Sequence, residues 1–222
     1  MRGELATDNL EELGAEESAE LSPSAGSLMT MFASKTAEDY LEVALGALGH
    51  SRAERRAVLD ELPVPIYLTD AGGLVTYWNQ ACVDFAGREP TLGKDRWCVT
   101  WEIHTTTDEP LPHDQCPMAV AIRERREIRG EVAIAMRPDG SRKAFRPYPT
   151  PLFDADGHLA GAINMLIDVS EEQEKSLADQ AARCRRLAGA VCDQTAAGIL
   201  RRMAKGYEAN AAALRVGALT AP

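Results

Sequence analysis

Apolar and polar residues alternate in five short stretches of the chain, which is the period of a β-strand with one buried face. Three of the intervals between these stretches combine Asp with Gly, at residues 70–73, 138–141 and 154–157. Gly adopts the positive φ angles that a tight reversal needs, and Asp hydrogen-bonds back to its own backbone there. The pattern therefore predicts three antiparallel hairpins. The expected strands span residues 65–69, 74–79, 131–137, 141–153 and 159–169.

Apolar residues at helical spacing predict helices before, between and after these strands. Ser51 and Glu54 form the pattern of a capping box at the start of a short helix. The interval 80–130 favours several short helices. After the last strand, two amphipathic runs favour a helical hairpin, the simplest arrangement of two consecutive helices. The apolar positions of these two runs are Leu177, Ala181, Cys184, Leu187, Ala188 and Val191, and then Ile199, Met203, Tyr207 and Leu214.

The order of these elements divides the chain into four parts and predicts the α+β class. Residues 1–34 are acidic and nearly without aromatics, so we expect a disordered leader that cannot bury enough apolar surface to fold. Residues 35–61 form N-terminal amphipathic helices, which either lie across the sheet or meet a second subunit. Residues 62–170 form the compact domain, and residues 171–222 form the C-terminal helical hairpin.

Charge and cysteine usage narrow the classes of partner. The net charge is −10, and residues 1–34 hold one arginine against seven acidic residues. An acidic field disfavours nucleic acid, and the arginines between Arg183 and Lys205 are typical of a solvated helical face. Five cysteines without a C-x-x-C pair indicate free thiols in a reducing compartment. No apolar run is long enough for a membrane helix, so we expect a cytoplasmic protein.

Several motifs, taken in order, resemble those of bacterial PAS domains. The resemblance covers residues 62–173. Its matching segments are residues 62–70 (LPVPIYLTD), 73–79 (GLVTYWN), 80–87 (QACVDFAG), 137–141 (RPDGS), 156–157 (DG), 161–165 (GAINM) and the closing 168–170 (DVS).

The resemblance implies a PAS fold, in which a five-stranded antiparallel sheet has helices on one face and encloses a small cavity. In such domains the cavity holds haem, a flavin, an organic acid or nothing, so the cofactor is unknown. The closing Asp168 and Ser170 imply a junction that couples the sheet to an output helix. Ser170 is also placed to cap that helix.

Residues 171–222 contain neither histidine nor a Gly-rich nucleotide loop. We therefore expect a stand-alone PAS protein that acts by binding a protein partner, such as a signalling kinase or regulator. The amphipathic flanking helices suggest that it also forms a homodimer.

Five residues are candidates for the wall of the cavity. Large apolar side chains with a few polar groups are typical of a small-molecule pocket. The candidate ligand-binding residues are Trp78, Trp97, Trp101, Met136 and Asn164. The alternative is that they are ordinary core residues and that side chains fill the cavity.

The sequence gives weaker evidence for a haem, metal, flavin or catalytic site. His104, His113 and Cys116 suggest a haem or metal site, but the prolines around them, including Pro117, equally indicate a loop that ends at a helix start. The sequence around Cys82 does not match the cysteine motif of flavin photosensors. No set of nucleophile, base and oxyanion donors is visible, so we expect neither a catalytic site nor a metal.

Prolines at alternate positions mark the fourth strand. Pro147, Pro149 and Pro151 suit a strand whose hydrogen-bond donors are unpaired or bulged on one side. The alternative is a partner-binding segment in polyproline conformation.

Two functions of different class follow. In the first, the domain senses a small molecule or a redox state and transmits the signal by protein contact. In the second, it is a constitutive scaffold with a filled cavity. The expected coupling residues in the first case are Asp168 and Ser170.

Overall fold

The computed structural model describes the backbone of residues 36–219 and the side chains of residues 36–215. The acidic leader expected at residues 1–34 lies outside this described part. The strands are β1 Ile66–Asp70, β2 Val75–Trp78, β3 Glu102–His104, β4 Ala133–Met136, β5 Arg142–Pro147, β6 Thr150–Phe153 and β7 Leu159–Asp168. The α-helices are α2 Ala37–Ala47, α3 Arg52–Asp60, α4 Gln80–Ala86, α5 Pro117–Glu124, α6 Ser170–Ala190 and α7 Gln194–Leu219.

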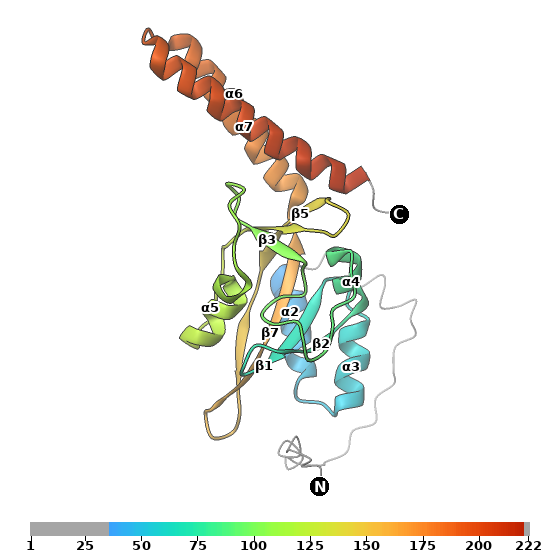
Figure 1. The fold of residues 1–222 in the computed structure, drawn as a ribbon. Coiled ribbons are helices and arrows are strands. Elements are labelled where there is room, and N and C mark those ends of the chain that lie inside the picture. The colour runs from blue at the N-terminus through green and yellow to red at the C-terminus, as the bar shows by residue number, and fades with distance from the viewer. Residues whose placement is uncertain (1–35, 220–222) are drawn as a thin grey trace. The chain divides into compact units, whose positions relative to one another are not determined.

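All strands pair antiparallel in the order β2-β1-β7-β5-β4-β3, with β6 also paired to β7 (Figure 1). The predicted α+β class and antiparallel sheet are confirmed. Within the described residues the sheet has seven strands, whereas five were predicted. One extra strand arises from a break in the predicted strand 141–153, and the other is β3.

The break in the predicted strand 141–153 lies at its prolines. Strand β5 pairs with the C-terminal half of β7, placing Pro147 opposite Leu166, and β6 pairs with the N-terminal half, placing Pro151 opposite Ala162. Pro149, between the two strands, has no N–H to donate, so the ladder is interrupted there. The polyproline alternative is wrong, because this segment is part of the sheet.

The interval 80–130, predicted to be helical, is only partly so. It holds α4, α5 and a single 3-10 turn at His113–Gln115, with β3 between them. Strand β3 extends the sheet beyond β4, with Ile103 opposite Ala135. Pro110 and Pro112 follow β3 and prevent a continuous helix across this region.

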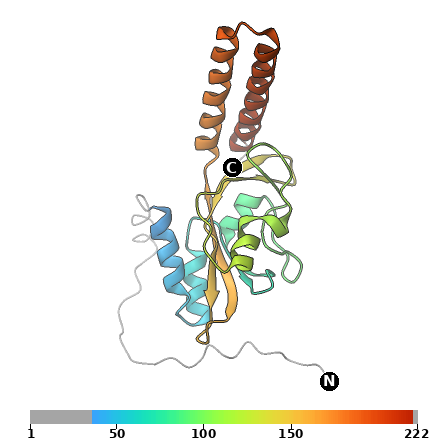
Figure 2. The same ribbon diagram turned by 90° about the vertical axis from the view of Figure 1, so that its left-hand side faces the viewer.

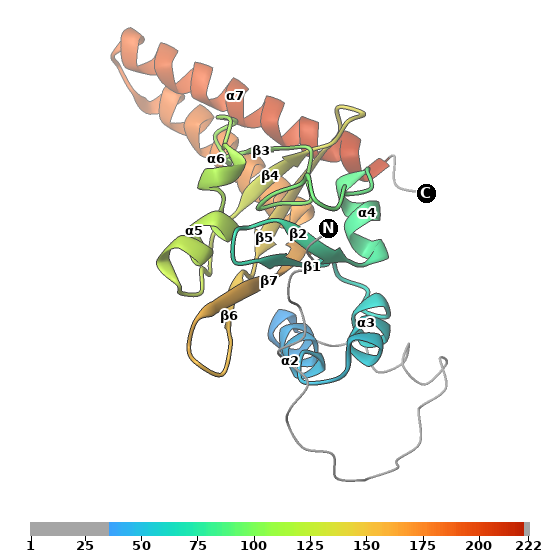
Figure 3. The ribbon, with the colours of Figure 1, turned by 60° about the horizontal axis from the view of Figure 1, so that its bottom comes forward.

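Helices cover both faces of the sheet. Helices α4 and α5 lie on the inner face, over a core that includes Tyr67, Phe145 and Met118. Figures 2 and 3 show α2 and α3 on the opposite face of β1 and β7. On β7, Ile163 and Met165 alternate with the inner-face residues and are fully buried as well.

The C-terminal hairpin of α6 and α7, which the sequence predicts, continues directly from β7 (Figure 1). Small residues in its seam allow the two helices to approach closely. The buried residues are Leu177, Ala181, Cys184 and Ala188 on α6, and Ala197, Ala204, Ala211 and Leu214 on α7. At its base, Leu214 packs in one cluster with Ile134 and Ala144 on the outer face of β4 and β5.

None of the described helices combines the length and the apolar character needed to cross a membrane.

Candidate functional site

A buried polar network lies in the middle of the inner core. The Tyr67 hydroxyl donates to the carbonyl of Trp97 at 2.9 Å and accepts from Asn164 Nδ2 at 2.9 Å. Asn164 Oδ1 accepts from the backbone N–H of Tyr148 at 2.9 Å. Tyr67 and Asn164 meet because they are register partners on β1 and β7. Burial raises the pKa of Tyr67 well above its usual range, so the hydroxyl stays neutral and links three segments.

Buried thiols surround this network. The Cys98 sulfur lies 3.1 Å from the Thr100 hydroxyl, and the Cys116 sulfur lies 3.8 Å from the Trp97 carbonyl oxygen. Burial raises the pKa of Cys116 to about 12. Burial also raises the pKa of Cys82, whose thiol donates to the Ile66 carbonyl at 3.2 Å. Cys82 and Cys116 are therefore protonated at neutral pH, which makes them weak nucleophiles.

Trp97 closes the interior on the side of the β1–β2 turn. Its backbone has φ 68°, a conformation that is rare for a bulky residue. Its N–H donates to the Gly73 carbonyl at 2.8 Å, and its indole lies where a Cβ on Gly73 would overlap it. Two residues earlier, the backbone carbonyl of Asp95 accepts from the N–H of Val75 at 2.9 Å. The segment ending at Trp97 thus covers the edge of β2 and forms a wall of the core.

The structure separates the five candidate cavity residues. Trp78 and Trp97 pack half-buried against the inner core, and Asn164 is buried within it. Trp101 is 54% exposed, so it does not line the interior. Ala133 and Ala135 of β4 belong to the inner core. Because side chains alternate along a strand, Met136 lies on the other face of β4 and does not line the interior as predicted. The remaining candidates are Trp78, Trp97 and Asn164.

His104, His113 and Cys116 do not form a group compact enough to hold a metal ion in the described part of the chain. His104 Nδ1 lies 3.2 Å from an Asp108 carboxylate oxygen, and burial lowers the pKa of His113. Pro117 is the first residue of α5, as the loop-to-helix interpretation expects.

In the described part of the chain, only one group of three or more residues drawn from His, Cys, Asp and Glu is compact enough to hold a metal ion. It is Asp154, Asp156 and His158, in the exposed β6–β7 turn.

The second part of the site is the junction between β7 and α6. One Asp168 carboxylate oxygen accepts from the Ser170 N–H at 3.0 Å and from its hydroxyl at 2.6 Å. The other oxygen pairs with Lys143 Nζ at 2.9 Å. The Ser170 hydroxyl in turn accepts from the Ala144 N–H at 3.0 Å. The first turn of α6 is therefore bound to β5 as well as to β7.

Ser170 does not cap α6, contrary to the sequence prediction. The N-cap residue is Val169, whose aliphatic side chain cannot accept a hydrogen bond. The Ser170 hydroxyl is instead bonded to the Ala144 N–H and to the Asp168 carboxylate. The Asp168 carboxylate instead accepts a first-turn N–H. An anion at a helix N-terminus is also favoured by the helix dipole.

The charge of Asp168 stabilises this junction. Burial alone would raise the pKa of Asp168, but the Ser170 hydroxyl and Lys143 hold it below its ordinary value. A lowered carboxyl pKa contributes stability that is complete above the unfolded-state value of about 4 and is lost as the pH falls through the folded-state value.

Lys143 links the junction to the inner core, and the sequence analysis missed it. Its Nζ lies 5.6 Å from the centre of the Phe85 ring, in the inner core, and also pairs with Asp168. Asp168 shares the inner face of β7 with Asn164, four residues earlier. A lysine in a strand is an ordinary surface residue by pattern, so only the paired strands reveal its position.

The comparisons agree with this architecture. Residues 59–174, just over half of the chain, match the family described as "PAS fold". The protein therefore belongs to the PAS family.

Among solved structures, a Rhodobacter sphaeroides LOV protein is 16% identical, with 82% of this chain and 97% of that one covered and a TM-score of 0.41. The PAS domain of Bordetella pertussis BvgS is 24% identical, with 51% of this chain and 80% of that domain covered and a TM-score of 0.35. The PAS domain of a Colwellia psychrerythraea protein is 16% identical, with 52% of this chain and 94% of that domain covered and a TM-score of 0.36. No curated protein matches the sequence.

Proposed function

We propose that this PAS protein is a signal transducer whose output element is the α6–α7 hairpin, and that it acts by protein contact rather than by catalysis. The observation that carries the proposal is the junction, where Asp168, Ser170 and Lys143 bind the first turn of α6 to the sheet. A change in the sheet must either carry α6 with it or break these hydrogen bonds.

The proposed input is a small molecule or a redox change in the inner core. Tyr67, Asn164 and the Trp97 carbonyl form a connected network beside buried thiols. A polar group that binds there competes for these hydrogen bonds, and Asn164 lies on the strand that leads to α6. Trp78 and Trp97 are the proposed apolar walls of this site.

A scaffold with a filled interior is the second candidate function. The observation that favours it is the complete pairing of the Tyr67 hydroxyl and of Asn164 Oδ1 within the protein. Buried polar groups that already have partners offer little to a ligand.

An absorption spectrum of the purified, untagged protein, followed by native mass spectrometry, distinguishes the two functions. A Soret or flavin band, or a bound small molecule, supports the sensor. Only Trp and Tyr absorption, with the mass of the bare chain, supports the scaffold.

The proposed partner is a protein, such as a signalling kinase or regulator, in a reducing compartment such as the cytoplasm. All five cysteines are free thiols, which supports that compartment. A second copy is the other candidate partner. However, Leu41 and Ala44 of α2 are already buried within this chain, so a homodimer is not needed to cover that helix.

Replacing Asp168 with Ala is expected to loosen α6 while leaving the PAS domain folded. The variant loses the Ser170 and Lys143 contacts, which we expect to raise opening of the first turns of α6 by roughly fivefold, about 1 kcal/mol. Limited trypsin digestion should then cleave faster at Lys175 and Arg183. Asp154→Ala, in the exposed turn away from α6, is the matched control. Equal cleavage rates in all three proteins would contradict the coupling role of Asp168.

A further inference from the structure

The distal half of the hairpin exposes large apolar side chains. Leu187 of α6 is 45% exposed, and Ile199 and Met203 of α7 are 46% and 44% exposed. Ile199 and Met203 are four residues apart and so share one face of α7. Leu187 and Arg183 are likewise four residues apart on α6. We call these four residues the tip surface.

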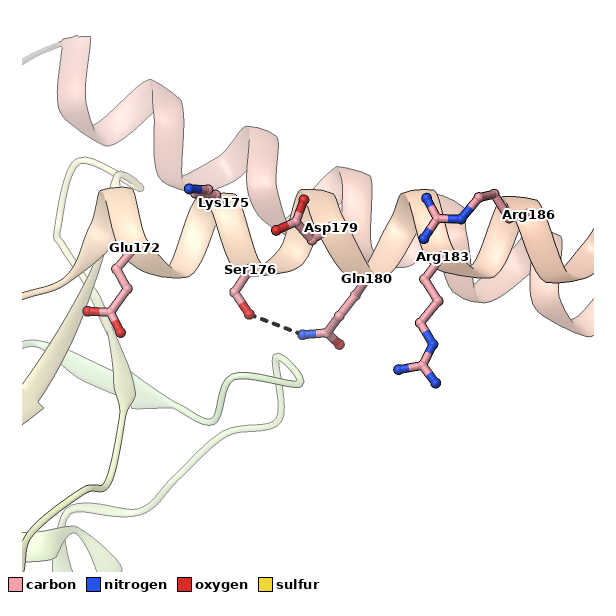
Figure 4. Close-up of a pocket in the computed structure, with 7 residues that line it drawn as sticks. All are labelled: Glu172, Lys175, Ser176, Asp179, Gln180, Arg183 and Arg186. Carbon is pink, nitrogen blue, oxygen red and sulfur yellow. Dashed lines mark hydrogen bonds between the residues drawn. The ribbon is translucent and has the colours of Figure 1, made fainter.

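The tip surface continues an interface that is already formed. Met203 lies one helical turn before Tyr207, and Tyr207 packs against the cluster that joins Leu214 to the sheet. The apolar stripe of α7 thus runs from the covered base of the hairpin to its open end. On α6, Arg183 lines a shallow hollow of about 500 Å³, shown in Figure 4 with Ser176 and Gln180 on the same side of the helix.

The segment that carries the tip surface is rich in basic residues. Between residues 183 and 205 the only acidic residue is Asp193, in a chain whose net charge is −10. All six cations of this segment are exposed, and within the described residues only Arg185 forms an ion pair, with Glu208. These cations are Arg183, Arg185, Arg186, Arg201, Arg202 and Lys205. Five of them therefore have no carboxylate partner in the described structure.

We propose that the tip surface is a docking site for an acidic amphipathic helix of a protein partner. The partner's apolar residues cover Leu187, Ile199 and Met203, and its carboxylates pair with Arg183 and the neighbouring arginines. Helices that bind an apolar surface of this kind do so with apolar residues at three- and four-residue spacing. This inference rests on the proposed function, because the hairpin must present a surface if it is the output element.

Other occupants fit the surface less well. A second copy laid tip to tip would bring two clusters of unpaired arginines together, which like-charge repulsion opposes. An anionic membrane favours a helix with a broad apolar face that includes aromatic residues, and the tip surface has none. Nucleic-acid backbone contact uses the cations but leaves the three apolar side chains uncovered.

A peptide-display selection against the full chain tests the proposal. Displayed helical peptides that bind should be acidic and carry Leu, Ile or Met at three- and four-residue spacing. Their affinity should fall by at least about tenfold for the double variant Leu187→Gln, Met203→Gln, and similarly for Arg183→Gln. Leu92→Gln is the matched control, because Leu92 is 59% exposed and lies in the loop beside β2, whereas the hairpin contacts β5.

Several outcomes would overturn this assignment. The assignment is overturned if the selected peptides are basic or neutral, or if the selection yields no binder. It is also overturned if the peptides bind the double variant as tightly as the wild type. Sedimentation that shows a dimer lost in the double variant would assign the surface to a second copy. Co-sedimentation with phosphatidylglycerol vesicles, lost in the same variant, would assign it to a membrane. Because the Asp168→Ala digestion measures the junction alone, failure at the tip is distinguishable from failure of the proposed function.

Discussion

Replacing Asn79 with Ala is expected to lower the free energy of unfolding by about 4 kcal/mol. Asn79 is 1% exposed. Its Oδ1 accepts from the N–H groups of Ile66 at 3.0 Å and Cys82 at 3.2 Å. Its Nδ2 lies 2.9 to 3.2 Å from the carbonyls of Leu59, Leu62 and Val64.

One side chain therefore holds the end of α3, the start of β1 and the first turn of α4, so its removal leaves several buried groups unpaired. Urea unfolding measures the loss. Asn79→Ser is the matched control, because a serine hydroxyl keeps the cap of α4 and should recover about 1 kcal/mol. A loss below about 1 kcal/mol in Asn79→Ala would show that these hydrogen bonds do not join the N-terminal helices to the sheet.

Replacing Gly161 with Ala is expected to cost about 3 kcal/mol or more. Gly161 is the register partner of Asp70, and an added Cβ would overlap the backbone carbonyl oxygen of Thr69. Backbone cannot move aside as a flexible side chain can, so β1 must separate from β7.

Thermal and urea unfolding of Gly161→Ala are compared with those of Gly198→Ala. A Cβ on Gly198 would have nothing within 4 Å, and this residue lies inside α7, so the control is expected to gain about 0.5 to 1 kcal/mol. Equal stability of the two variants would contradict the close approach of β1 and β7.

The local parts of the fold could be predicted from the sequence because short-range chemistry determines them. Gly73, Gly140 and Gly157 all have positive φ angles in the predicted turns. Both hydrogen bonds of the capping box form: the Ser51 hydroxyl accepts from the Glu54 N–H, and the Glu54 carboxylate accepts from the Ser51 N–H at 3.1 Å. These features depend on residues at most a few positions apart.

The face of β4 could not be predicted correctly, because both of its faces are apolar. Val132, Ile134 and Met136 share one face of this strand and are larger than Ala133 and Ala135, and the sequence analysis placed Met136 in the wall of the cavity. The structure places Ile134 and Val132 in the outer cluster with the hairpin instead. Size alone does not identify the inner face when a distant helix covers the outer one.

The candidate site was predictable only where a motif marks it. Asp168 and Ser170 belong to the closing motif of the family resemblance, and their hydrogen bonds form. Tyr67 and Lys143 were missed because their partners lie far along the chain: 97 residues separate Tyr67 from Asn164, and 25 separate Lys143 from Asp168. Such pairs are determined by strand register, which a single sequence specifies weakly.

Amide hydrogen exchange of the wild-type protein and Tyr67→Phe tests the central claim most directly, namely that the inner core and the hairpin are coupled. Tyr67→Phe removes the hydroxyl from the core network without touching α6 or α7. The account predicts faster exchange in the first turns of α6 and in the α7 segment packed on β5, with Leu92→Gln unchanged from wild type. Faster exchange confined to the core strands, with hairpin rates equal to those of wild type, would contradict the coupling.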